Sequence, residues 1–225
     1  MYIQCAPSMP KTNLQLLFLI LGLAQIQAMI AQKTGDWAYK GEKDGIKIYH
    51  QKTPGLLHIK LSTVVKAPLS GIAALFSDVD NYKDWGYKIS ESRLLRRVSP
   101  TEVWYYAKYD FPWPLDDRDI ILQSIMQQDA ITRRVVITNT PHPSYLPEKK
   151  GISRIKNTTT RWTFLPGEGG WVSMEQQIST DSAEDMPDWL VTMTVDTGPR
   201  ETAKAVRKIL QKEKYQTVRL AHIRD

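Results

Sequence analysis

The segment at residues 111–119 constrains the fold more than any other part of the chain, because it separates two strand-like runs. It reads Phe-Pro-Trp-Pro-Leu-Asp-Asp-Arg-Asp and lies between residues 103–109 and residues 120–126, which are aromatic or aliphatic in character. Its two prolines impose an extended, non-helical path. Arg118 then leads into an apolar strand, so its guanidinium either faces solvent or lies inside, where it needs an acceptor. An interior arginine would indicate that the sheet encloses something with a polar end.

The N-terminus predicts a targeting segment. Residues 16–23 form an unbroken apolar run, and Lys11 is the only charged residue before Lys33. About nine apolar residues suit the core of a signal peptide but fall well short of the ~20 that span a bilayer. We therefore expect a cleaved signal peptide at residues 1–31 and a mature domain at residues 32–225, exported to the periplasm or the extracellular space. An uncleaved anchor and a start at Met9 remain open as alternatives.

The composition gives little support for catalysis, metal binding or nucleic-acid binding. The net charge of +6 is modest and spread along the chain, and the only cysteine, Cys5, would be lost with the signal peptide. The four histidines are scattered, with none at metal-ligand spacing, and no nucleophile elbow, phosphate-binding loop or dinucleotide motif occurs. We expect a monomer with no cofactor, no metal and no nucleic-acid partner.

The order of elements predicts an α+β fold. Expected strands lie at residues 37–40, 46–51, 57–66, 89–98, 102–111, 119–128, 133–140, 151–164 and 171–180. Apolar residues at helical spacing predict a helix at residues 68–79, and an interrupted apolar stripe predicts a long final helix at residues 187–214. The Gly198-Pro199 pair lies inside that last helix and should bend it. An antiparallel sheet curled around the final helix need not be filled by its own side chains, so a cavity becomes plausible.

Three segments in this order resemble one known family. The first reads Phe-Ser-Asp-Val-Asp-Asn-Tyr-Lys-Asp-Trp at residues 76–85, followed by Ser-Glu-Ser-Arg-Leu-Leu at residues 90–95. The second is Pro-Trp-Pro at residues 112–114 with Asp-Arg-Asp-Ile at residues 117–120. The third starts at Met186 and continues through Gly-Pro-Arg-Glu-Thr at residues 198–202. Together they are similar to the START (steroidogenic acute regulatory protein-related lipid transfer) domains, in particular bacterial ones, which have the helix-grip fold of the Bet v 1-like proteins.

The resemblance implies a hydrophobic tunnel between the sheet and the C-terminal helix. Such a tunnel binds one lipid or similar apolar molecule without covalent chemistry. The family's strand-entry arginine, which corresponds to Arg118, often lies at the inner end of the cavity. Arg118 is therefore a candidate to hold a polar headgroup, and the alternative is a structural salt bridge to Asp110 or Asp117.

Further candidates for ligand contact come from one strand and from the last helix. Tyr105 and Tyr109 share a strand face with period-two spacing, and they are the better candidates to line the cavity. Leu190, Val191 and Met193 lie on the expected lid helix, where methionine adapts to variable ligand shapes. Plain core packing is the alternative for each of these five residues.

The sequence therefore predicts a single-domain, non-catalytic binding protein for a lipid or other apolar small molecule, with transient contact to a membrane surface as a further option. Two rival hypotheses stay open. The first is a helix-grip enzyme of the cyclase or hydratase type, which would need an acid–base pair inside the cavity. The second is an interaction module whose cavity is collapsed and whose function lies on its surface.

Overall fold

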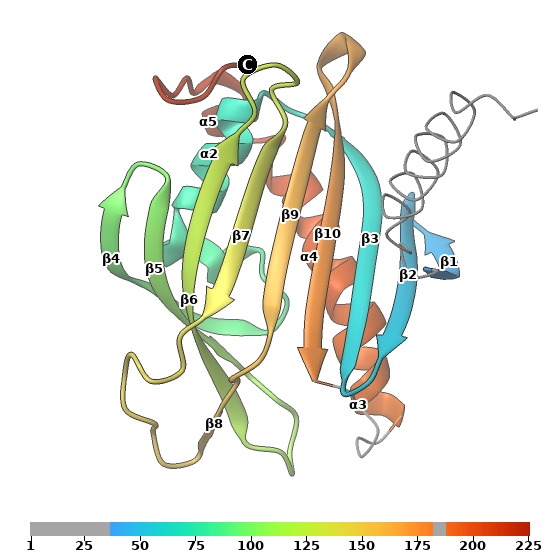
Figure 1. The fold of residues 1–225 in the computed structure, drawn as a ribbon, viewed down its shortest axis with the longest axis vertical. Helices are drawn as coiled ribbons and strands as arrows, with labels where there is room; N and C mark the ends of the chain where they lie inside the picture. Colours follow the sequence, from blue (N-terminus) through green and yellow to red (C-terminus); the bar gives the residue numbers. More distant parts are fainter. Residues whose placement is uncertain (1–36, 182–187) are drawn as a thin grey trace, which may run out of the picture. The chain divides into compact units, whose positions relative to one another are not determined.

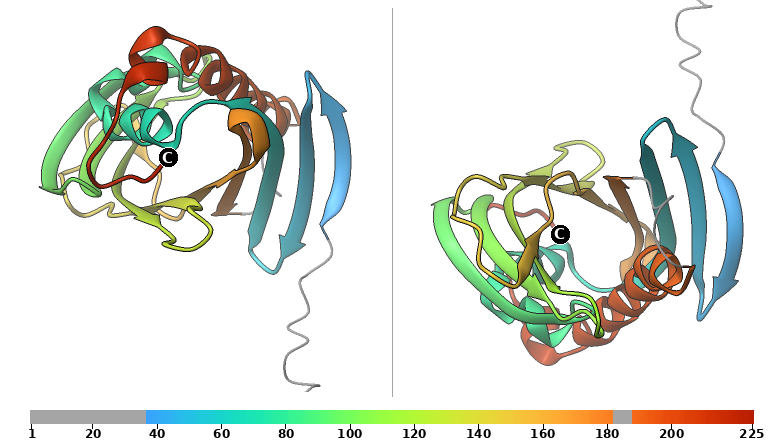
Figure 2. Two further views of the ribbon diagram at one scale, coloured as in Figure 1. Left: turned by 90° about the horizontal axis from the view of Figure 1, so that it is seen from above. Right: turned by 90° about the horizontal axis from the view of Figure 1, so that it is seen from below.

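The structure, a computed structural model, describes residues 37–181 and 188–225. These residues form a ten-stranded curved sheet with helices packed on its concave side (Figures 1 and 2). The predicted α+β class, with the sheet wrapped around the C-terminal helix, is confirmed. The predicted signal peptide and Pro187, the expected first residue of the last helix, lie outside the described residues.

The sheet contains nearly all of the predicted strands. They are β1 (Ala38–Lys43), β2 (Ile46–Thr53), β3 (Leu56–Lys66), β4 (Ile89–Ser99), β5 (Glu102–Tyr109), β6 (Asp117–Gln128), β7 (Val135–Pro141), β8 (Ile152–Arg154), β9 (Thr159–Pro166) and β10 (Trp171–Asp181). The order across the sheet is β1-β2-β3-β10-β9-β7-β6-β5-β4, with antiparallel neighbours throughout, and β8 pairs in parallel with β6. The prediction of one strand at residues 151–164 is wrong, because the chain leaves β6 after Arg154 and crosses to lie between β7 and β10 as β9.

Strand β3 shows how the sequence selects the buried face of the sheet. Leu57, Ile59, Leu61, Thr63 and Val65 are each at most 7% exposed, whereas the residues between them are partly or fully exposed. Side chains alternate between the two faces of a strand, so the predicted apolar face of β3 is confirmed as the concave one.

The helices depart from prediction mainly at the C-terminal end. They are α2 (Leu69–Ser77), the 3-10 turn η1 (Val79–Asp84), the short 3-10 turn η2 (Glu168–Gly170), α3 (Asp188–Thr192), the π-helical turn η3 (Met193–Thr197), α4 (Gly198–Ile209) and α5 (Glu213–Thr217). The last long helix thus ends at Ile209 rather than at Lys214, and α5 follows as a separate piece.

The expected bend at Gly198-Pro199 takes the form of a π-helical turn. Thr192, Thr197 and Gly198 all keep right-handed helical backbone angles, so the chain stays helical from α3 through η3 into α4. Because Pro199 has no backbone N–H, it cannot continue a regular hydrogen-bond ladder, and a widened turn before it accommodates the missing donor. Gly198 is needed there because a Cβ atom would lie 2.9 Å from the Met193 carbonyl oxygen and 3.2 Å from the Tyr87 ring.

Half of the concave face is filled by α2 and α4. Phe76 of α2 contacts the ring of Phe164 on β9, with 5.4 Å between the ring centroids. Ile72, Phe164 and Val206 are completely buried in the same core. Figure 2 shows α2 and α4 inside the curve of the sheet. This half of the interior is therefore a packed core.

The convex face of the sheet carries a buried ion pair under the loop at residues 142–151. Arg154 of β8 binds both carboxylate oxygens of Asp119 on β6 at 2.6 and 3.1 Å, and both side chains are 1% exposed. The same guanidinium donates to the backbone carbonyls of Pro143, Leu146 and Pro147 in the loop. Arg154 therefore ties the loop to the sheet.

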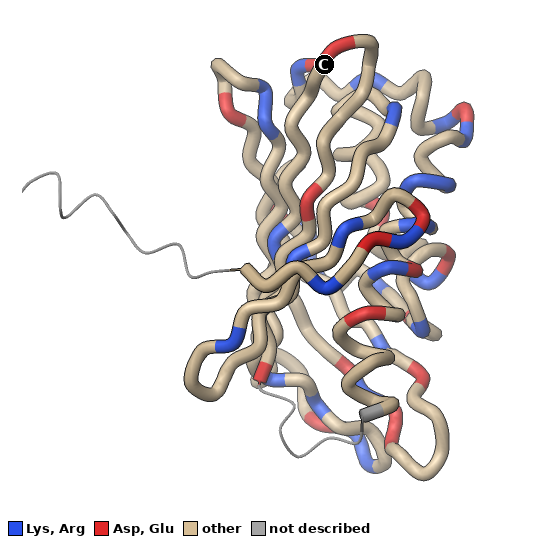
Figure 3. The backbone as a smooth tube through the Cα atoms, turned by 90° about the vertical axis from the view of Figure 1, so that its right-hand side faces the viewer, with Lys and Arg blue, Asp and Glu red and all other residues tan. Residues whose placement is uncertain are grey.

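The charged residues outside this pair are dispersed. Figure 3 shows basic and acidic positions intermixed along the described chain rather than gathered on one element. Of the described helices, none combines the length and the apolar character needed to cross a membrane.

Candidate functional site

The other half of the concave face is hollow. A cavity of about 470 Å³ lies between the sheet and the helical segment that runs from η3 into α4. Its apolar walls come from Leu57, Ile59, Ile120, Leu122, Ile178 and Val195. This volume falls within the ~300–1,000 Å³ typical of sites for one small molecule, so the cavity has not collapsed.

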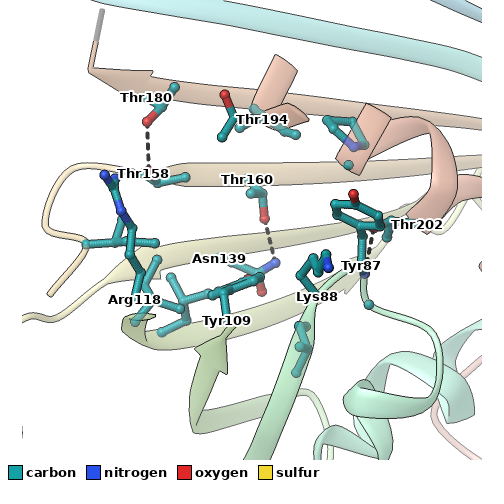
Figure 4. Close-up of a pocket in the computed structure, with 18 of the residues that line it drawn as sticks. Tyr87, Lys88, Tyr109, Arg118, Asn139, Thr158, Thr160, Thr180, Thr194 and Thr202 are labelled. Carbon is teal, nitrogen blue, oxygen red and sulfur yellow. Dashed lines mark hydrogen bonds between the residues drawn. The ribbon is translucent and has the colours of Figure 1, made fainter. Parts of the chain in front are cut away.

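Side-chain size explains why this half is open. The inward positions at this end of the sheet include Asn139 on β7, Thr160 on β9 and Thr180 on β10, together with Thr158 just before β9 (Figure 4). These short side chains do not reach the helix, whereas the large rings of Phe76 and Phe164 fill the packed half. The cavity therefore follows from a change of residue type along strands that continue through both halves.

Aromatic rings close the cavity at the end nearest the packed core. Phe76 lies 5.3 Å from Trp85 and 5.1 Å from Trp162 between ring centroids, and Tyr82 lies 5.1 Å from Tyr105. The Tyr82 hydroxyl donates to the Phe76 carbonyl oxygen at 2.6 Å, which fixes η1 against α2. Ring contacts of this kind add roughly 0.5–1.5 kcal/mol each beyond burial, so this end is closed by mutually stabilising aromatic side chains.

Arg118 lies at the opposite end of the cavity. It is the second residue of β6 and is partly exposed, so its expected position at the inner end is wrong. The proposed salt bridge is also absent, because Asp110 and Asp117 both bind Lys108, at 3.4 and 3.1 Å. Within the described residues Arg118 forms no ion pair, and its guanidinium lies 4.9 Å from the centroid of the Phe111 ring.

The other predicted residues are only partly brought together. Tyr105, Tyr109 and Met193 line the cavity with Arg118. Leu190 and Val191 do not line it: Leu190 is 2% exposed, and Val191 packs against the hydrophobic core. Whether any of these residues binds a ligand stays a prediction.

The two cavity tyrosines are neutral hydrogen-bonding groups at ordinary pH. Burial raises the pKa of Tyr109 to about 12. Burial, followed by the neighbouring Tyr82, raises the pKa of Tyr105 well above its usual value. Neither phenol therefore loses its proton near neutrality.

Sequence reasoning missed the polar side chains in the middle of the cavity. Asn139 and Gln176 both line it, and they are 5% and 7% exposed. Each occupies an inward position of an otherwise apolar alternation, Asn139 after Val135 and Ile137, and Gln176 between Met174 and Ile178. A polar residue on the apolar face of a predicted strand was the signal that could have found them.

No group of three or more histidine, cysteine, aspartate or glutamate residues suited to a metal ion occurs in the described part of the chain. The charged residues that line the cavity are instead mainly basic. Besides Arg118 they are Lys88, Arg154 and Lys156, with Asp181, and Lys156 is paired with Glu148 at 3.0 Å.

Comparison with known proteins agrees with this architecture. The START domain profile matches residues 23–216. An uncharacterized protein of Pseudomonas aeruginosa is 28% identical over 179 residues, which cover 79% of this chain and 88% of that protein. The crystal structure of a STAR-related lipid transfer protein fragment from Xanthomonas axonopodis is 25% identical, with a TM-score of 0.70, and the match covers 79% of this chain and all of that one. Human STARD10 shares the fold, with a TM-score of 0.66 at 18% identity over 84% of this chain and 80% of the human one. The chain, with its curved sheet gripping a C-terminal helix, belongs to the START domain family.

Proposed function

We propose that the protein binds one lipid or similar hydrophobic molecule in the cavity and releases it chemically unchanged. The observation that carries this proposal is an apolar cavity of about 470 Å³ enclosed by a START fold. The name of the Xanthomonas relative, a STAR-related lipid transfer protein, supports the same class of ligand.

The driving force is the removal of apolar surface from water. Each methylene group moved into the cavity contributes about 0.8 kcal/mol. Among the described residues Arg118 has no carboxylate partner, and a carboxylate or phosphate headgroup would supply one. Exchange of ligand requires the cover of the cavity to move, and the π-helical turn at η3 is a suitable hinge because its hydrogen bonding is already irregular.

The site of action in this proposal is outside the cytoplasm, following the predicted signal peptide, and the protein acts as a monomer that carries, stores or presents its ligand. Transient contact with a membrane surface is part of the proposal. Trp113, between β5 and β6, is 92% exposed, and tryptophan rings favour the membrane–water interface.

An enzyme of the same fold is less well supported. Catalysis of the cyclase or hydratase type requires an acid–base pair facing the substrate. Among the described lining residues the one carboxylate is Asp181, which is exposed, and no histidine is present. The raised pKa of Tyr109, about 12, makes that phenol a poor proton donor near neutrality.

The test is to identify bound lipid and then to remove the arginine. Native mass spectrometry of the purified protein, followed by organic extraction, should give one bound species per chain. Arg118→Leu should weaken binding of a fluorescent fatty acid by roughly 10- to 100-fold, the range expected for one charged hydrogen bond. Arg161→Leu is the matched control, because Arg161 is an exposed arginine of β9 that does not line the cavity.

The two parts of the proposal fail separately. A protein that yields no extractable lipid and shows no saturable binding of the fatty acid does not have the proposed function. Equal affinities of the wild type and a folded Arg118→Leu variant would remove only the headgroup role of the arginine.

A further inference from the structure

Buried polar atoms without hydrogen-bond partners are concentrated at the cavity. Four such side-chain atoms occur in the described part of the chain, and three of them belong to lining residues: Nε1 of Trp85, Oδ1 of Asn139 and Oε1 of Gln176. An unpaired buried acceptor costs about 1–3 kcal/mol, and native structures contain few of them. The two acceptors among them, on Asn139 and Gln176, line the same cavity and are available to a ligand group that donates to them.

Asn139, Thr160 and Gln176 form a polar row across three adjacent strands. Asn139 of β7 is the register partner of Thr160 on β9, and Gln176 of β10 is the register partner of Trp162, two residues further along β9 on the same face. The Asn139 amide donates to the Thr160 hydroxyl at 2.7 Å. This bond leaves the Asn139 oxygen as an acceptor and the Thr160 proton as a donor, while Gln176 adds a second acceptor.

The polar row is separated from Arg118 by an apolar stretch. The residue opposite Asn139 on β6 is Ser124, six positions beyond Arg118. The residues between them on the same face of the strand are Ile120 and Leu122, and both line the cavity. A molecule that spans the two polar places must therefore be apolar in between.

We propose that this row binds a hydroxyl or amide N–H group carried partway along the apolar body of the ligand. The ligand class is thus an oxygenated lipid with an internal hydrogen-bond donor, rather than a plain hydrocarbon chain with one polar end. An internal hydroxyl donates to Asn139 or Gln176 and accepts from Thr160, so it pairs one of the two acceptors and the Thr160 donor. This inference rests on the proposed lipid-binding function.

The pairing should give selectivity rather than affinity alone. A site built to bind a hydroxyl group rejects an analogue that lacks it, because the analogue leaves the acceptors of the site unpaired. One or two such hydrogen bonds correspond to a preference of roughly tenfold or more.

The experiment compares three fatty acids in displacement of a fluorescent fatty acid. Octadecanoic acid has no hydroxyl group, 2-hydroxyoctadecanoic acid carries one beside the carboxylate, and 12-hydroxyoctadecanoic acid carries one in the chain. The wild type should bind the 12-hydroxy acid about tenfold more tightly than the other two. In Asn139→Leu/Gln176→Leu the three affinities should become equal, with octadecanoic acid bound at least as well as before.

Controls separate the polar row from general effects on the cavity. Ile178→Val changes an apolar lining residue beside the row and should preserve the preference. Gln176→Leu alone keeps the Asn139–Thr160 hydrogen bond and should lose part of the preference for the 12-hydroxy acid. This single variant replaces the double variant if the latter fails to fold. Equal wild-type affinities for all three acids, or a preference that survives in the double variant, would overturn the inference. Absence of saturable binding for every acid would instead overturn the proposed function on which it rests.

Discussion

The two faces of the sheet differ in whether their buried polar groups have hydrogen-bond partners. On the convex face, Asp119 is bound by both arms of the Arg154 guanidinium, and the remaining donors of Arg154 go to backbone carbonyls of the covering loop. On the concave face, and counting only residues 37–181 and 188–225, Asn139 and Gln176 keep buried oxygens without partners, and Arg118 forms no ion pair. The fold can satisfy buried polar groups completely, and this contrast supports the proposal that the unpaired groups on the concave side pair with a ligand.

The largest expected effect comes from breaking the convex pair. Arg154→Met should lower the free energy of unfolding by about 3–5 kcal/mol, because Asp119 then stays buried without a counter-charge. Arg118→Met should change it by about 0.5 kcal/mol or less, since the concave arginine is partly exposed and forms no ion pair with the described residues. Urea denaturation of both variants measures the contrast.

A double variant tests whether the large loss of stability in Arg154→Met arises from the Asp119 carboxylate that is left without a counter-charge. Asp119→Leu/Arg154→Met removes both partners and should lose much less stability than Arg154→Met alone. If the two single arginine variants were equally stable, the contrast between the faces would be wrong.

The second contrast lies within the concave face, between its packed and its hollow half. Phe164→Ala should cost about 3–5 kcal/mol, since Phe164 is completely buried and packs against Phe76 and Trp162. Ile178→Ala should cost about 1 kcal/mol or less, because its side chain borders space that is already open. Urea denaturation measures both, and a similar loss in the two variants would mean that the cavity closes over Ile178 in solution.

The sequence predicted the scaffold better than the site, for a physical reason. Strand alternation such as that of β3 and the proline-shaped entry to β6 are local signals, so the order of elements and the fold class followed from them. The division of residues 151–164 into β8 and β9, and the place of Arg118 in the cavity, depend on which strands pair. Strand pairing joins residues that are far apart in the sequence. The partners of Asp110 and Asp117 were misassigned because Lys108, two residues before Asp110 and opposite Asp119 in the β5–β6 register, binds both carboxylates, whereas Arg118 lines the cavity.

The same limit explains the missed polar row. Asn139 and Gln176 each interrupt the apolar alternation of one strand, but only the β7-β9-β10 order brings them to one inner surface. Leu190 and Val191 were expected on the ligand side of the last helix, but the π-helical turn at η3 presents Met193, Thr194 and Val195 to the cavity instead. A regular helical period cannot anticipate that change.

The smallest expected effect concerns the fourth unpaired buried atom, Nε2 of His50 on β2. Burial lowers the pKa of His50 below its ordinary value of 6.5, and Lys40 adds to this, whereas the backbone of Val195 and the carboxylate of Asp196 oppose it. The unfolded chain therefore binds a proton at a higher pH than the folded protein does. Since folding then excludes that proton, the free energy of unfolding should fall as the pH drops through 6.5 and level off below the folded-state pKa.

Replacement of the imidazole isolates this contribution. His50→Gln should flatten the decrease in unfolding free energy between pH 7.5 and pH 5.5, while at pH 8 its stability should stay within about 0.5 kcal/mol of the wild type. Urea denaturation at several pH values measures the slope. A slope identical to that of the wild type would assign the acid sensitivity to other groups. A reduced slope would show that an unpaired nitrogen beside the π-helical turn at η3, unlike the paired groups of the convex face, makes the protein sensitive to pH.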